Sequence, residues 1–120
     1  MRICQVVAIA LVASTSLAAS AETPVINSAS VVRTDGLWDF TATISHKDKG
    51  WEDYVTAWRV LDPSGREVGV RELHIPHDGG GTRTRALSGV SLNDDITFVE
   101  IEVRHSMLGW GGDRHRLQVR

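Results

Sequence analysis

The feature that most restricts the fold is a strict two-residue alternation of apolar and polar side chains between Leu37 and Ser45. The apolar positions are Trp38, Phe40, Ala42 and Ile44. Successive side chains of a β-strand point to opposite faces, whereas an amphipathic helix repeats its apolar residues every three or four positions. The pattern therefore predicts a strand with one buried and one exposed face.

Six further segments have strand-like patterns and are separated by turn residues. They cover residues 28–33, 54–61, 66–75, 82–91, 96–104 and 114–120. The segment 54–61 is apolar on both faces, which predicts a central strand. Between it and the next segment, Asp62-Pro63-Ser64-Gly65 fits a type I turn. Seven short strands separated by regular turn signals predict an all-β, antiparallel sandwich of the immunoglobulin or fibronectin type III kind.

Two stretches support this prediction by resemblance. Residues 99–119 read Val-x-Ile-x-Val, then Gly-Trp-Gly-Gly, then a final strand, and this stretch resembles the last hairpin of a fibronectin type III module. Gly109–Gly112 would form its loop. Gly50-Trp51, Trp58-Arg59-Val60 and the same glycine-rich loop resemble small exported bacterial proteins without an assigned function. The first resemblance implies the fold, and neither implies an activity.

The first 21 residues predict an export signal. Arg2 precedes the apolar run 3–13, and small residues follow it up to Ala21. These are the three regions of a secretory signal peptide, and the apolar run is too short to span a membrane. Cleavage after Ala21 would leave one domain, residues 22–120, in the periplasm or outside the cell. It would leave no integral membrane segment and would remove Cys4, the single cysteine.

Composition excludes several function classes. Without cysteine the exported domain forms no disulfide, and blue-copper ligation is excluded because it needs a thiolate. The whole chain has 13 basic and 15 acidic residues, a net charge of −2. These charges are interspersed and contain no basic block, so nucleic acid is not expected as a partner.

The chain has five histidines, and the predicted topology places all of them at one end. In such a sandwich the connections after the second, fourth and sixth strands meet there. His46 follows the second predicted strand, and His105 follows the sixth. His74 and His77 lie at the end of the fourth strand, and His115 begins the seventh from the same end.

Register makes His46 and His105 the central candidates. His46 has the same parity as Ile44, and His105 has the same parity as Val103, so both continue an apolar face. The two strands face each other across an immunoglobulin-like core, so the rings are expected to approach. Clustered imidazoles suit zinc or copper(II), and a thioether favours copper(I). The predicted metal ligands are His46, His74, His77 and His105, with Met107 or His115 as a supplementary ligand. The neighbouring Glu52-Asp53 is a candidate for orienting a ligand.

Ordinary polar packing is the alternative for these histidines. His74 and His77 are three residues apart, which places them on opposite faces of a strand unless Pro76 turns the backbone. Trp51 and Trp110 lie in glycine-flanked loops at the same end, where they either cap the core or anchor a protein or sugar.

Two functions follow from these patterns. We expect an exported, non-enzymatic binding module whose histidine- and tryptophan-bearing end holds copper or zinc. The alternative is a protein-interaction or cell-envelope module in which the histidines only pack. An enzyme is not expected, because the spacing shows no nucleophile–base pair and a small sandwich encloses little volume for chemistry.

Overall fold

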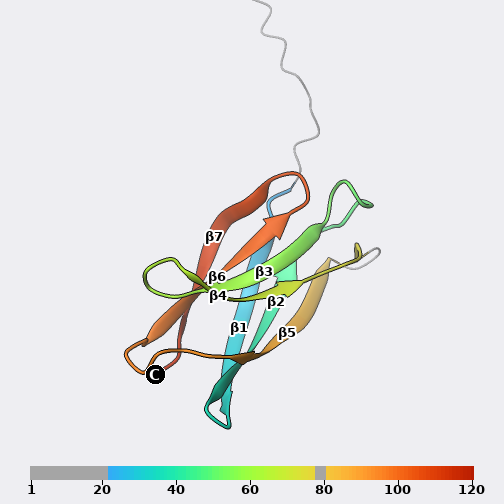
Figure 1. Cartoon of the computed structure of the whole chain (residues 1–120). Coiled ribbons are helices and arrows are strands. Elements are labelled where there is room, and N and C mark those ends of the chain that lie inside the picture. Colours follow the sequence, from blue (N-terminus) through green and yellow to red (C-terminus); the bar gives the residue numbers. More distant parts are fainter. Residues whose placement is uncertain (1–21, 78–80) are drawn as a thin grey trace, which may run out of the picture.

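The computed structural model describes residues 22–77 and 81–120. The predicted signal peptide lies outside the described residues. Within them, seven antiparallel strands form two sheets that pack together (Figure 1). The prediction of an all-β sandwich with seven antiparallel strands is confirmed. In the part of the chain that is described, no helix has the length and apolar character needed to cross a membrane.

The two sheets differ in size. The three-stranded sheet has the order β1-β2-β5 and comprises β1 (Val25–Thr34), β2 (Leu37–Ser45) and β5 (Thr82–Val90). The four-stranded sheet has the order β4-β3-β6-β7 and comprises β3 (Val55–Leu61), β4 (Glu67–Glu72), β6 (Phe98–His105) and β7 (Gly109–Gln118). β3 lies between β4 and β6, which confirms the central strand. β2 has the predicted bounds, and its buried residues alternate with less buried ones.

Strand ends differ most from prediction in β7. This strand begins at Gly109 rather than Arg114, so the prediction that Gly109–Gly112 forms a loop is wrong. The register between β6 and β7 shifts between Ile101 and Val103, and Gly111 and Gly112 have positive φ angles of 154° and 80°. The two glycines therefore form a bulge within the strand, because glycine adopts positive φ angles without steric strain. Elsewhere, β1 starts at Val25 rather than residue 28, and β4 ends at Glu72 rather than residue 75.

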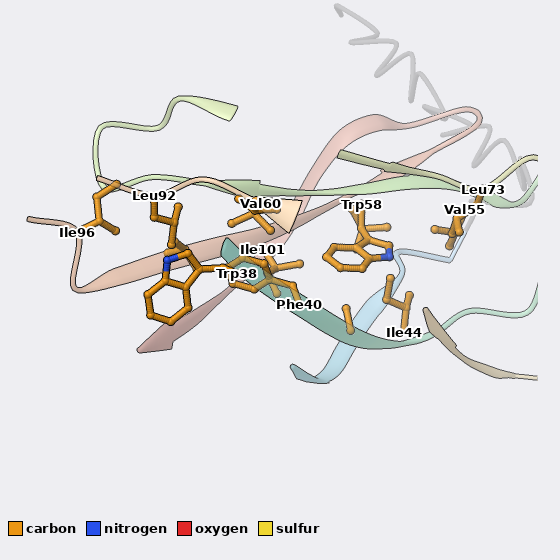
Figure 2. Packing of buried hydrophobic residues seen from close by; sticks show 14 residues of the cluster. Trp38, Phe40, Ile44, Val55, Trp58, Val60, Leu73, Leu92, Ile96 and Ile101 are labelled. Carbon is orange, nitrogen blue, oxygen red and sulfur yellow. The ribbon is translucent and has the colours of Figure 1, made fainter. Parts of the chain in front are cut away.

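The core fills the space between the sheets. All four apolar residues of the β2 alternation are buried, and they face Trp58 and Val60 of β3 and alternate residues of β6. Figure 2 shows Trp38, Leu92 and Ile96 at one end of this core and Ile44, Val55 and Leu73 at the other. At this second end, His46 directly follows β2, and His105 is the last residue of β6. The β2–β3 and β6–β7 connections lie at this end of the sandwich (Figure 1).

Candidate metal centre

His46 and His105 close the core at this end. His46 follows β2 and is 8% exposed, while His105 is the last residue of β6 and is 2% exposed. Their ring centroids are 5.0 Å apart, with an interplanar angle of 67°. The prediction that the two rings approach one another across the core is confirmed. Because the rings come from different sheets, they join the two layers where the apolar core ends.

Asp53 lies between the two rings. Its Oδ1 is 2.7 Å from Nε2 of His105 and 3.5 Å from Nε2 of His46. The β2–β3 connection folds back to place it: the Lys49 N–H donates to the Asp53 carbonyl (2.7 Å), and Gly50 has a φ of 77°, which favours glycine. One donor atom from each of Asp53, His46 and His105 lies within 4.8 Å of the others, and this group could hold a metal ion.

Asp48 supports His46 from the opposite side. Its side chain is 1% exposed, and its carboxylate accepts hydrogen bonds from His46 Nδ1 (2.7 Å) and from the backbone N–H of His77 (2.6 Å). Arg83 of β5, itself buried, donates to the same carboxylate (3.1 Å) and to the carbonyl of Val55 (3.3 Å). Burial lowers the pKa of Arg83, and the negative charge of Asp48 partly opposes that effect. The carboxylate that orients His46 is thus held by a buried cation.

The partners of His46 indicate which ring nitrogen carries a proton. Nδ1 lies 2.7 Å from an Asp48 oxygen, and a carboxylate only accepts hydrogen bonds, so Nδ1 donates. Nε2 is buried and has no hydrogen-bond partner among the described residues. In the neutral ring this nitrogen keeps a free lone pair next to Asp53. A histidine whose far nitrogen donates to a carboxylate is the usual form of a metal ligand.

His105 has the opposite arrangement. Its Nδ1 accepts hydrogen bonds from the backbone N–H groups of Met107 (3.0 Å) and Leu108 (3.3 Å). The proton of the neutral ring is therefore on Nε2, which donates to Oδ1 of Asp53. As neutral rings, the two histidines are therefore tautomers of different kinds, and both point Nε2 toward one carboxylate.

The other predicted ligands lie outside this group. Neither His74 nor His77 belongs to the set of donor atoms that includes His46, within the ranges described. His74 is exposed and lines a surface hollow with His105, whereas His77 contributes its backbone N–H to Asp48. Met107 is 59% exposed, and its backbone N–H faces His105.

His115 lies apart from the histidine end. It pairs with Ile101 within the β6–β7 ladder, so the expectation that it begins the last strand is wrong. The physical reason is the earlier start of β7 at Gly109, which moves His115 into the interior of the strand.

The two candidate tryptophans have different surroundings. Trp51 is 65% exposed and meets Tyr54 edge-on, with ring centroids 5.8 Å apart. Trp110 is half-buried on the outer face of the four-stranded sheet, with the guanidinium of Arg59 4.0 Å and that of Arg104 5.2 Å from its ring centroid. Trp110 therefore does not cap the core, and Trp51 has the exposure of an anchor.

Sequence reasoning included Asp53 only as a neighbour and missed Asp48 and Arg83. Arg83 carries a usable signal, because it has the parity of Leu87, an inward-facing residue of β5. A charged residue at a buried position requires a partner of opposite charge. Nothing local in the sequence identifies Asp48 as that partner.

Comparisons with known proteins add no family to this description. No family model matches the chain, and no curated protein or solved structure matches it.

Proposed function

We propose that this chain is an exported, non-enzymatic binding module that holds one transition-metal ion between His46, Asp53 and His105. The observation that carries the proposal is the buried Nε2 of His46, which has no hydrogen-bond partner among the described residues and lies 3.5 Å from the Asp53 carboxylate. Leaving a buried polar atom unpaired costs about 1–3 kcal/mol. A metal ion bound to this nitrogen removes that cost.

The donor set favours zinc or copper(II). Two imidazoles and one carboxylate are ligands of borderline metals, and their donor atoms lie within 4.8 Å of one another. With neutral rings, Asp48 and Asp53 outnumber Arg83 by one negative charge, which a divalent cation offsets. Because both histidines are almost completely buried, the ion is held rather than presented to a substrate.

The fold and the location of the protein form part of the same proposal. The strand orders β1-β2-β5 and β4-β3-β6-β7 support a fibronectin type III-like arrangement within the immunoglobulin-like sandwiches. The residue pattern of the first 21 positions supports export to the periplasm or beyond. A domain that folds without cysteine does not depend on the redox state of that compartment.

Native mass spectrometry of the exported protein, titrated with zinc and then with copper(II), tests the proposal. We expect one equivalent of metal to bind the wild type and to be lost in the double variant His46→Ala/His105→Ala. The double variant His74→Ala/His77→Ala is the matched control and retains one equivalent. Absence of stoichiometric binding, or equal loss in both double variants, would contradict the proposed site.

A second function is favoured by the exposed apolar residues of the same end. Trp51, Ile75, Met107 and Leu108 are between 52% and 65% exposed. Exposed aromatic and apolar side chains are typical anchors of protein interfaces. An interaction module predicts a partner whose capture is lost in Trp51→Ala and is unaffected by a chelator, whereas chelator-sensitive capture favours the metal-dependent function.

A further inference from the structure

We infer that metal binding at this centre rearranges the exposed turn at Met107 and Leu108, so that occupancy of a buried site changes the surface of the protein. The inference rests on the proposed function, because it requires a metal ion at His105. It concerns the consequence of binding rather than binding itself, and the two can therefore fail separately.

The hydrogen bonds of His105 determine the position of its ring proton. A neutral imidazole has one N–H and one lone pair. In this structure the lone pair is on Nδ1, where the backbone N–H groups of Met107 and Leu108 donate to it at 3.0 and 3.3 Å. The N–H is on Nε2 and donates to Asp53 at 2.7 Å. Every polar atom of the ring is thus satisfied without a metal.

A metal ion reverses this pattern. The ion takes the Nε2 lone pair, so a neutral ring then carries its proton on Nδ1. That proton points at the N–H groups of Met107 and Leu108, which places three donors together without an acceptor. Metal-bound histidines normally donate this N–H to a carboxylate, a carbonyl or water. The present turn provides none of these to His105, so it has to open or the ring has to move.

His46 has no such conflict. Its Nδ1 already donates to Oδ1 of Asp48 at 2.7 Å, and its Nε2 is free. His46 can therefore accept a metal ion without changing its other contacts. The asymmetry makes His46 the ready ligand and His105 the ligand whose binding is coupled to its surroundings.

The segment that would rearrange is short and lies between Ser106 and Gly109. Ser106 is anchored to Tyr54 in both directions: its N–H donates to the Tyr54 carbonyl (2.9 Å), and its hydroxyl accepts from the Tyr54 N–H (3.0 Å). Gly109 follows with a φ of 72° and open space where a Cβ would lie. Between these two points, Met107 and Leu108 are 59% and 52% exposed. The rearrangement is therefore confined to two apolar residues at the surface.

Nuclear magnetic resonance of the ¹⁵N-labelled exported protein, with zinc chloride as the probe, tests the inference. We expect one equivalent of zinc to move the His105 proton from Nε2 to Nδ1 and to shift the amide signals of Met107 and Leu108. The amides of the opposite turn, Asp35 and Gly36, are the control and remain unchanged. Zinc binding that leaves the His105 tautomer and both turn amides unaltered overturns the inference but not the proposed function. Failure to bind zinc overturns the inference, and failure to bind both zinc and copper(II) overturns the proposed function as well.

A variant provides a second measurement. Met107→Pro removes one of the two opposing N–H donors, and the φ of Met107 is not positive, because Asp35 is the one non-glycine residue with positive φ among those described. We expect zinc affinity to rise about fivefold, which corresponds to one hydrogen bond. Leu108→Ala keeps its backbone N–H and is the matched control, with affinity within about twofold of the wild type. Unchanged or weaker zinc binding by a folded Met107→Pro variant contradicts the inference.

Discussion

Replacing Asp48 with alanine perturbs the most highly connected polar group at the histidine end. Its carboxylate is 1% exposed and lies 3.1 Å from the guanidinium of Arg83 and 2.7 Å from Nδ1 of His46. It also accepts a hydrogen bond from the N–H of His77. The substitution therefore removes the carboxylate that pairs with one buried cation and accepts from three N–H donors, those of His46, His77 and Val55.

The expected loss is large for a domain of this size. Removing one partner of a buried ion pair costs about 3–5 kcal/mol, because the remaining charge has no compensation. Small domains unfold with total free energies of about 5–15 kcal/mol. Asp48→Ala should therefore remove a substantial fraction of the stability, and it should also weaken metal binding about 10–100-fold through the orientation of His46.

Urea denaturation in the presence of a chelator measures the first effect without a contribution from metal. The double variant Asp48→Ala/Arg83→Met is the control, because it removes the orphaned charge and should recover at least about 1 kcal/mol relative to Asp48→Ala. A loss below about 1 kcal/mol for Asp48→Ala would place the residue among ordinary surface substitutions and refute the role given to the network. A double variant Asp48→Ala/Arg83→Met that is no more stable than Asp48→Ala would also refute the role given to the network.

Two further predictions concern the sheets. Burial raises the pKa of Glu102, but hydrogen bonds and charges from Arg59 and Arg114 outweigh this and hold the pKa below its ordinary value of 4.5. The stability that this carboxylate contributes is therefore complete above that value and is lost as the pH falls through the lower folded pKa. Glu102→Gln should be less stable than the wild type at neutral pH, and the two stabilities should converge in acid. Urea denaturation from pH 7 downward measures this. A difference in stability that stays constant with pH would argue against the pairing of Glu102 with Arg59 and Arg114. Trp58 is fully buried and Trp51 is 65% exposed, so Trp58→Ala should cost about 3–5 kcal/mol and Trp51→Ala less than about 0.5 kcal/mol in the same assay. Similar costs for the two would contradict the assignment of the core.

Local sequence patterns were sufficient for several parts of the structure. The alternation in β2 predicted which of its residues are buried, because side-chain parity in a strand is fixed by backbone geometry, and the polar residues on either side predicted both of its ends. The turn after β3 forms as expected, with the Gly65 N–H donating to the Asp62 carbonyl at 2.9 Å. The same parity argument predicted that His46 and His105 would face each other. These conclusions needed only the residues of each segment and the pairing of two layers.

The composition of the candidate metal centre was decided by the tertiary structure. Asp53 reaches both rings because the β2–β3 connection folds back on itself, and Asp48 meets Arg83 across 35 positions of the sequence. The N–H groups of Met107 and Leu108 determine the tautomer of His105 through the geometry of one turn. No sequence period encodes such contacts, because loop backbones have no fixed parity and the partners come from different strands. The amino-acid sequence by itself determined which side chains face the core. Packing of the two sheets determined which of these side chains meet, because a buried polar group can pair only with groups that the fold brings within hydrogen-bond distance.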